Sequence, residues 1–292
     1  MQVSNPQMDP AGDPNRSVYD SPEVAQHYAG LNYLSACEQH LFQKHLRRGS
    51  DILDLGVGGG RTTSHLSSIA RRYVGVDYAP RMVEACRTKF PGLEFHAMDA
   101  ADLSTFENSS FDAVVFAFNG IDCLVPDANR KRCLQECGRV LRHGGLAILS
   151  VHNPHAIFVR ALWDQDRVRR FARKLVRGQS KMLGPVTAGV TCAKALITTS
   201  RAARASAARI VKRVPHPMFW KGEGWMRDSA HGGLTLHYAE PTRVVAEAEA
   251  HGFAAVQVLG DDYPRPSRRY ITDWYYYVFA KRNKTARRQP CV

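Results

Sequence analysis

The stretch D-I-L-D-L-G-V-G-G-G-R at residues 51–61 decides the fold that we expect for this chain of 292 residues. A short apolar run enters a cluster of glycines, and a segment with helical periodicity follows at 61–71. This order predicts a strand at 51–55, a tight turn and the start of a helix. Because glycine lacks a Cβ, the turn can be sharp and a ligand can approach the main chain closely.

The spacing of these glycines excludes two patterns that bind phosphate groups. A dinucleotide fingerprint needs glycine at the sixth position counted from Gly56, and Arg61 stands there. A P-loop needs a lysine after its last glycine, and this turn has none. What remains is D-x-G-x-G-x-G, which runs from Asp54 through Gly56 and Gly58 to Gly60.

The remaining pattern resembles motif I of the class I S-adenosylmethionine (SAM)-dependent methyltransferases. The acidic first residue suits a cofactor whose amino-acid end carries an ammonium group. The resemblance implies that Asp54, Gly56, Gly58 and Gly60 contact SAM. A lone glycine-rich turn can also be purely structural, so the segments that follow decide between the two readings.

A second strand, expected at 73–77, ends in a carboxylate at the spacing that such a site needs. Asp77 stands 21 residues after Gly56, where a carboxylate can accept hydrogen bonds from both ribose hydroxyls. The segment V-G-V-D-x-x-P-x-M resembles motif II of the same family. It implies cofactor contacts from Asp77 and from the neighbouring Tyr78 and Met82.

A third strand, expected at 93–97, runs into the sequence M-D-A-A-D. Asp99 and Ala100 resemble motif III, in which an acidic side chain or the neighbouring backbone contacts the adenine amino group. Asp102 is interpreted instead as a helix cap or turn residue.

A fourth strand, expected at 111–118, is almost wholly apolar, as a strand buried on both faces should be. Ligands of open α/β sheets bind beyond the carboxyl ends of the strands, which places Phe118 and Asn119 at the predicted site. Phe118 could face the SAM sulfonium through a cation–π contact. Asp122 could touch a ligand or cap the turn. The loop lacks the N/D-P-P-Y motif of enzymes that methylate exocyclic amines of nucleic-acid bases.

The remaining periodicity completes the expected fold. The resemblance covers residues 19–153 and 231–282, and it implies an α/β fold with a Rossmann-like, seven-stranded, mostly parallel sheet. The further elements predicted are helices 81–89, 126–141 and 241–251, a fifth strand at 146–151, and a closing antiparallel pair at 255–259 and 274–280.

The segments outside this core have their own expected roles. Residues 1–18 are predicted to be disordered, and 283–292 form a loose basic tail. A helix is expected from Tyr19 to Leu46, and in this family such a lid helix often covers the cofactor. Tyr28 would then touch SAM or simply pack within the helix.

The insertion at 154–230 carries almost all of the net charge. Fourteen lysines and arginines between 160 and 213 face only two aspartates, which places twelve of the thirteen net positive charges there. Two basic amphipathic helices, 157–175 and 194–214, are predicted. They would either form a solvated helical cap over the substrate or contact an anionic membrane surface through residues 160–214.

Composition points to a cytoplasmic protein. The seven cysteines are odd in number and form no C-x-x-C pair, so we expect free thiols and no metal site. No secretory signal and no membrane-spanning stretch are expected, which leaves peripheral membrane contact as the alternative to a purely cytoplasmic location.

Together these features predict a biosynthetic enzyme that transfers a methyl group from SAM to a small-molecule or lipid-linked acceptor, with an oxygen as the expected target. A hydroxyl acceptor needs a group that takes its proton, and histidine suits this near neutral pH. His152, His231 and His237 are the candidates, of which His231 and His237 are the predicted catalytic pair.

Two alternatives belong to other functional classes. An RNA methyltransferase would use the basic insertion to bind phosphates, but the insertion is poor in aromatic residues for stacking on bases. A non-catalytic SAM-binding protein is the third class, because a fold does not fix a function.

Overall fold

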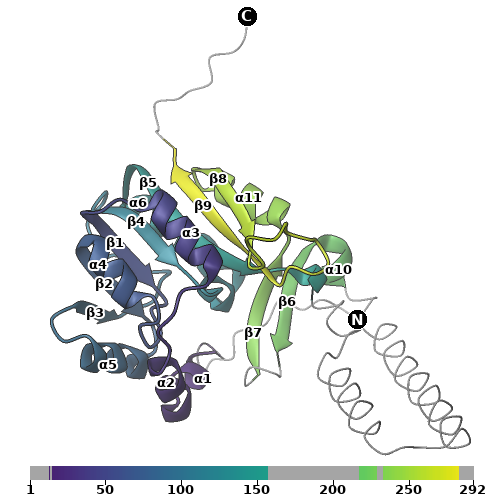
Figure 1. The fold of residues 1–292 in the computed structure, drawn as a ribbon. Helices are drawn as coiled ribbons and strands as arrows, with labels where there is room; N and C mark the ends of the chain where they lie inside the picture. Colours follow the sequence, from purple (N-terminus) through teal and green to yellow (C-terminus); the bar gives the residue numbers. More distant parts are fainter. Residues whose placement is uncertain (1–12, 14, 157–216, 229–232, 283–292) are drawn as a thin grey trace, which may run out of the picture.

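The computed structural model describes residues 13, 15–156, 217–228 and 233–282 (Figure 1). One sheet of seven strands runs through it in the order β3-β2-β1-β4-β5-β9-β8. The predicted basic helices 157–175 and 194–214 and the tail 283–292 lie outside the described residues. Of the segment 1–18 that was predicted to be disordered, residues 1–12 and 14 also lie outside them, whereas Asn15 is buried and residues 16–18 belong to a helix.

The expected seven-stranded, mostly parallel sheet is confirmed. The first five strands in this order, β3, β2, β1, β4 and β5, run parallel to one another. The strand β9 is antiparallel to both β5 and β8. The strands of the sheet are β1 (Ser50–Leu55), β2 (Ala70–Asp77), β3 (Glu94–Ala97), β4 (Phe111–Phe116), β5 (Leu141–His152), β8 (Phe253–Gly260) and β9 (Trp274–Lys281).

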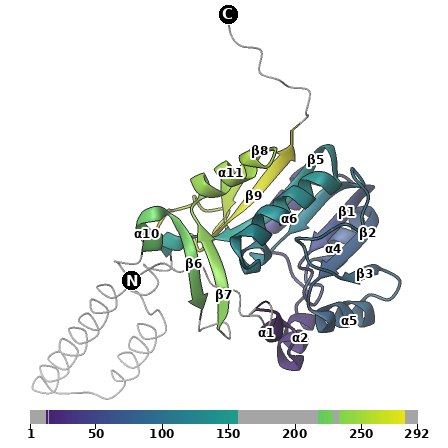
Figure 2. The same cartoon turned by 180° about the vertical axis from the view of Figure 1, so that it is seen from behind.

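Helices cover both faces of the sheet (Figures 1 and 2). Successive residues of a strand point to opposite faces, so Leu53 joins the core under one set of helices and Ile52 the core under the other. One face carries α6 (Asp127–Val140) and α11 (Pro241–Ala250), and the other carries α3 (Ala36–His45), α4 (Thr63–Ile69) and α5 (Pro80–Lys89).

The predicted single helix over 19–46 is wrong. The structure has α1 (Arg16–Tyr19), α2 (Pro22–Ala29) and then α3. Ser35 explains the break, because its side chain accepts from the Glu38 backbone N–H while Glu38 accepts from the Ser35 N–H, a capping box that begins a new helix.

The strand β2 also begins earlier than predicted. The helix expected to reach residue 71 ends at Ile69, and β2 starts at once with Ala70. Arg71 and Arg72 are paired there with Asp51 and Glu94 from neighbouring strands, so cross-strand ion pairs outweigh their helical propensity.

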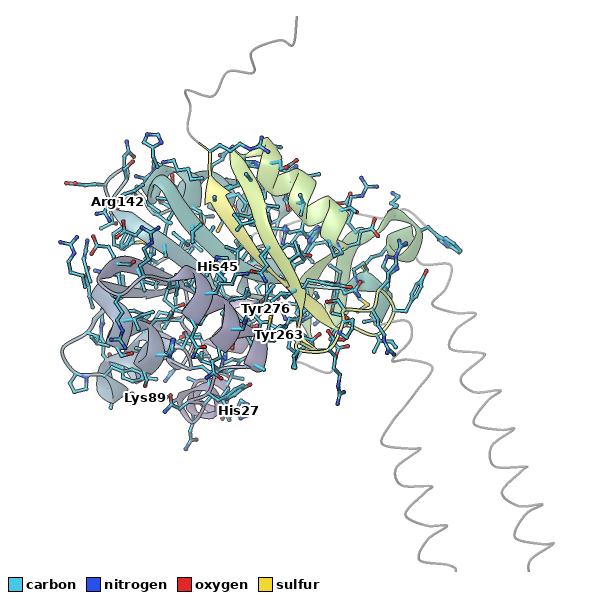
Figure 3. All side chains as sticks on the ribbon, turned by 45° about the horizontal axis from the view of Figure 1, so that its top comes forward. His27, His45, Lys89, Arg142, Tyr263 and Tyr276 are labelled. Atoms are coloured by element: carbon cyan, nitrogen blue, oxygen red, sulfur yellow. The ribbon has the colours of Figure 1, made fainter. Side chains whose placement is uncertain are left out.

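The N-terminal segment is tied to the rest of the fold by Asn15. Its fully buried side chain donates to the carbonyls of Cys123 and Thr235 and accepts from the Thr235 N–H. Lys89 at the end of α5 donates to the carbonyls of Ala29 and Leu31, which fastens the end of α2 (Figure 3). The two short helices are thereby held over the carboxyl ends of β1 and β2.

Gly59 sets how closely α2 approaches the glycine turn. A Cβ at this position would lie 2.2 Å from Ala29 N, a backbone atom that cannot move out of the way cheaply. We therefore expect Gly59→Ala to displace α2 and to destabilise the protein by about 1–3 kcal/mol, measured by urea unfolding.

The matched control for that variant is Gly30→Ala at the end of α2. Gly30 has a right-handed backbone, and its added Cβ would make only ordinary contacts. Equal stability of the two variants would contradict the close approach at Gly59.

A small second sheet stands beside the main one. The strands β6 (Glu223–Asp228) and β7 (Leu234–Ala239) pair antiparallel, and α10 (Pro217–Lys221) precedes them. The glycine-rich loop predicted at 217–225 is therefore a helix and a strand. In the part of the chain that the structure describes, no helix is long and apolar enough to cross a membrane.

Candidate functional site

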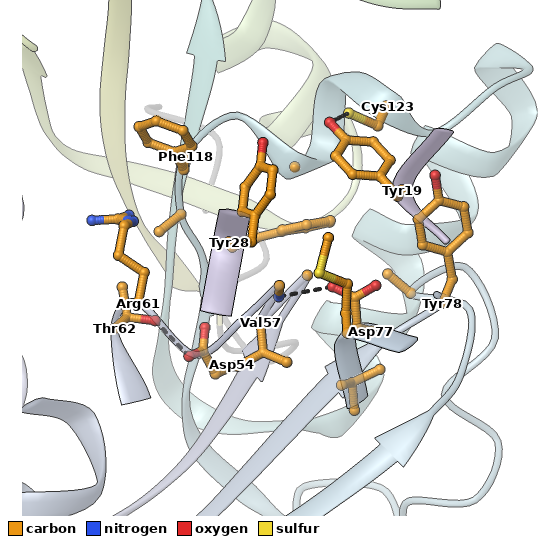
Figure 4. Close-up of a pocket in the computed structure, with 18 of the residues that line it drawn as sticks. Tyr19, Tyr28, Asp54, Val57, Arg61, Thr62, Asp77, Tyr78, Phe118 and Cys123 are labelled. Carbon is orange, nitrogen blue, oxygen red and sulfur yellow. Dashed lines mark hydrogen bonds between the residues drawn. The ribbon is translucent and has the colours of Figure 1, made fainter. Parts of the chain in front are cut away.

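A cavity opens at the carboxyl ends of β1, β2 and β4, where the predicted residues were expected to meet (Figure 4). It encloses about 890 Å³, part of it open to solvent. Ten of the twelve predicted cofactor residues line it: Tyr28, Asp54, Gly56, Gly58, Asp77, Tyr78, Met82, Asp99, Ala100 and Phe118. The other two, Gly60 and Asn119, do not.

Asp77 ends β2 with its carboxylate held in place by the backbone. One oxygen accepts from Gly58 N at 2.8 Å and the other from Ala79 N at 2.9 Å. Burial nevertheless raises the pKa of Asp77 to about 6, because these two bonds compensate only part of the lost hydration. A carboxylate oxygen has more than one lone pair, so both oxygens can still accept from a ligand hydroxyl.

Asp54 lies at the end of β1, below the glycine turn. One of its oxygens accepts from Thr62 Oγ1 at 2.8 Å and from Tyr73 OH at 2.9 Å. Burial raises the pKa of Asp54 to about 6, and a ligand cation at this carboxylate would favour its ionised form. Thr62 and Tyr73 thus orient a carboxylate that lines the cavity.

Gly56, Gly58 and Gly60 all have left-handed backbones, but only Gly56 and Gly58 line the cavity. The φ angles of Gly56 and Gly58 are 59° and 54°. A Cβ at Gly56 would lie 2.5 Å from the Phe116 ring, and one at Gly60 would lie 2.5 Å from the Phe90 ring. Gly60 therefore serves the packing of the turn against Phe90.

Tyrosines from the N-terminal helices close the cavity. The ring centroid of Tyr19 lies 6.1 Å from that of Tyr28 and 6.2 Å from that of Tyr78, in edge-to-face contacts. The Tyr19 hydroxyl lies 3.4 Å from Cys123 Sγ. The Tyr78 hydroxyl is buried and has no hydrogen-bond partner among the described residues, so it is available to a ligand.

A buried ion pair that the sequence did not predict stands at the other end of the cavity. Arg61 donates to both carboxylate oxygens of Glu38, at 2.7 and 2.5 Å. Its guanidinium also lies over the rings of Phe118 and Tyr33, 4.8 and 5.1 Å from their centroids. The sequence could have indicated a role for Arg61 only through its position directly after the glycine cluster. It could not indicate the pairing, because Glu38 belongs to the separate helix α3.

Phe118 and Asn119 turn the chain sharply after β4. Both have left-handed backbones, with φ of 56° and 63°, which costs side-chain-bearing residues energy and often marks a functional site. The turn leaves the Phe118 ring 40% exposed and Asn119 buried, with the Asn119 N–H donating to Ser150 Oγ.

The histidines named from the sequence lie in different places. His231 is outside the described residues. His237 is buried on β7 with its ring 5.0 Å from that of Trp225, outside the cavity lining, and burial lowers its pKa to about 2. His152 ends β5 and is hydrogen-bonded to Asp122 and Asn119.

Among known proteins, residues 52–145 match the family described as "Methyltransferase domain". A probable SAM-dependent methyltransferase of Mycolicibacterium smegmatis is 32% identical over 124 residues, which are 42% of this chain and 46% of that protein. Residues 52–145 therefore match a SAM-dependent methyltransferase domain.

Two further relatives have names that refer to quinones. A ubiquinone biosynthesis O-methyltransferase of Xanthomonas oryzae is 30% identical over 142 residues, 44% of this chain and 54% of that protein. A demethylmenaquinone methyltransferase of Clavibacter sepedonicus is 33% identical over 120 residues, 40% of this chain and 47% of that protein. The chain spans about half the length of the curated relatives that it matches.

One solved structure matches the fold of this protein over nearly the whole chain. The 1,6-didemethyltoxoflavin-N1-methyltransferase of Burkholderia thailandensis, with S-adenosylhomocysteine bound, has a TM-score of 0.56. The match covers 96% of this chain and 94% of that protein at 15% identity, so it shows the fold alone.

Proposed function

We propose that this protein transfers the methyl group of SAM to a small-molecule acceptor. The observation that carries the proposal is the Asp77 carboxylate, which is fixed at the end of β2 beside the glycine turn and faces a cavity closed by tyrosines. When bound, SAM supplies an electrophilic methyl group on a sulfonium, and the chain needs to hold it, orient the acceptor and exclude water.

The cofactor fits the lining residues by chemistry. Asp77 would accept from the two ribose hydroxyls, and Asp54 would face the ammonium group. Asp99 and Ala100 would contact the adenine together with Met82. The apolar walls and the Tyr28 and Phe118 rings suit a sulfonium, which aromatic faces attract through cation–π contacts.

An oxygen acceptor is the more specific part of the proposal. The curated relatives include a ubiquinone biosynthesis O-methyltransferase and a demethylmenaquinone methyltransferase, and both names refer to quinone compounds. We propose a small aromatic or lipid-linked acceptor in a biosynthetic pathway. Of the two bases expected from the sequence, His231 is outside the described residues, and His237 is buried away from the cavity lining.

The acceptor class can be tested with SAM carrying a tritiated methyl group. The purified protein is incubated with a boiled cell extract, which is then separated into organic-soluble, RNA and protein fractions. We expect the label in the organic-soluble fraction. Label in RNA would favour the RNA methyltransferase, and no transfer despite SAM binding would favour a non-catalytic SAM-binding protein.

The affinity for SAM is expected to fall below pH 6. Burial raises the pKa of both Asp77 and Asp54 from 3.8 to about 6. Below pH 6 both carboxyl groups are therefore largely protonated in the free protein. SAM binding requires both carboxylates in their ionised form, so a protonated carboxyl group has to release its proton on binding. For each such group the affinity falls about tenfold per pH unit below pH 6. Calorimetry at pH 5 and 7 should show at least a tenfold difference in Kd, and equal values would contradict the ionised contacts.

A further inference from the structure

We propose that His152 is the general base for the acceptor and that the acceptor is an aromatic hydroxyl compound, such as a phenol or a catechol. This inference rests on the proposed methyl transfer and names its acceptor chemistry. It comes from a cluster of contacts around His152, to which the ends of β4, β5, β7 and β9 contribute.

Asp122 fixes the orientation and the tautomer of the His152 ring. One oxygen of this fully buried carboxylate lies 2.8 Å from His152 Nδ1 and accepts from the His152 backbone N–H at 2.7 Å. With the proton on Nδ1, the lone pair of Nε2 can accept a proton from a substrate. The pair thus has the arrangement of a base held by an acidic partner.

Asp122 is in turn held by a buried arginine. Arg130 lies 3.2 Å from the second Asp122 oxygen and donates to Glu247 at 2.8 Å. Burial raises the pKa of Asp122, while His152 and Arg130 favour its ionised form. Arg130 and Glu247 are positioning residues, because they act on His152 only through Asp122.

Asn119 can assist the oxygen that loses its proton. Its Nδ2 lies 3.2 Å from His152 Nε2, and its Oδ1 is buried without a hydrogen-bond partner among the described residues. With the proton on Nδ1, His152 Nε2 accepts from Asn119 Nδ2. An acceptor hydroxyl would take the place of this hydrogen bond, donating to Nε2 and accepting from Asn119 Nδ2. The strained backbone of Asn119 holds its amide at this place.

Aromatic side chains surround His152 and favour a flat acceptor. The His152 ring centroid lies 5.2 Å from that of Tyr238 and 6.3 Å from that of Trp274. Trp274 also contacts Phe118, at 6.0 Å, and Phe118 lines the cofactor cavity. A ring bound against these side chains would therefore lie next to the cavity that holds the methyl donor.

The chemical step balances without any further reactant. The acceptor hydroxyl gives its proton to His152 Nε2 while its oxygen forms a bond to the methyl carbon. The methyl–sulfur bond breaks, its electron pair stays on sulfur, and S-adenosylhomocysteine and the methyl ether are the products. The imidazolium returns its proton to water, which the partly exposed His152 side chain can reach.

The test uses 4-nitrocatechol, whose absorbance distinguishes the neutral from the ionised form, and protein saturated with S-adenosylhomocysteine. We expect the probe to bind wild-type protein as the anion, with an ionisation constant at least tenfold higher than in free solution. His152→Gln should remove this increase, and Asp122→Asn should reduce it. His143→Gln on the exposed part of β5 is the matched control and should leave it unchanged.

Two outcomes separate the hypotheses. If S-adenosylhomocysteine does not bind in calorimetry, the proposed methyl transfer itself fails. If it binds but the probe does not, or if the bound probe is neutral, the His152 inference is overturned. Should His152→Gln fail to fold, nitrogen NMR of the wild-type imidazole decides, because a proton on Nε2 instead of Nδ1 would exclude His152 as the base.

Discussion

Asp77→Asn is expected to weaken SAM binding at least 100-fold. The carboxylate is placed to accept two hydrogen bonds from the cofactor, and a bond to a charged group contributes about 1.5–3 kcal/mol. Asparagine offers one acceptor oxygen and no charge, and its amide N–H groups would face the backbone donors Gly58 N and Ala79 N. Calorimetric titration with SAM at pH 7.5 measures the loss.

The control for this variant is Asp102→Asn. Asp102 also follows a strand of the parallel part of the sheet, β3, but its side chain is exposed and does not line the cavity. We expect unchanged affinity there. Undiminished binding in Asp77→Asn, with circular dichroism showing an intact fold, would remove the ribose role from Asp77.

Arg61→Ala is expected to lower the free energy of unfolding by about 3–5 kcal/mol. The substitution leaves the Glu38 carboxylate fully buried without its partner, and an unpaired buried charge is far more costly than the lost attraction alone. It also removes the guanidinium from the Phe118 and Tyr33 rings. Urea unfolding at pH 7.5 gives the change.

An exposed ion pair of the same chemistry provides the comparison. Arg72 and Glu94 form one between β2 and β3 with both side chains more than a third exposed, so Arg72→Ala should cost less than about 1 kcal/mol. Adding Glu38→Gln to Arg61→Ala should recover part of the lost stability, because the second change removes the stranded charge. Equal effects of Arg61→Ala and Arg72→Ala would show that burial does not set the cost.

The cofactor side of the site could be predicted because each of its parts is local in sequence. A strand, a glycine turn and a carboxylate at the next strand end are each recognisable within a few residues, and parallel strands bring their carboxyl ends together. Asp54, Gly56 and Asp77 therefore meet as expected. Gly60 has the same local pattern, but its space is taken by Phe90, a contact that spacing does not reveal.

The acceptor side could not be predicted in the same way. The bond between Asp122 and His152 joins residues 30 positions apart, and the sequence left Asp122 equally suited to capping a turn. His237 had the right residue type near the right place, but its environment is set by packing against Trp225. The match to the methyltransferase-domain family ends at residue 145, so it includes Asp122 and Asn119 but not His152, Tyr238 or Trp274.

The position of β9 has a consequence for how this chain is synthesised. β9 lies between β5 and β8 in the sheet, and its residues Tyr276 to Phe279 are almost fully buried. A nascent chain that has emerged from the ribosome only as far as β8 therefore exposes the apolar edge of β5 with no strand to cover it. Such an edge can pair with other chains, so we expect chaperones to bind the growing polypeptide until β9 arrives.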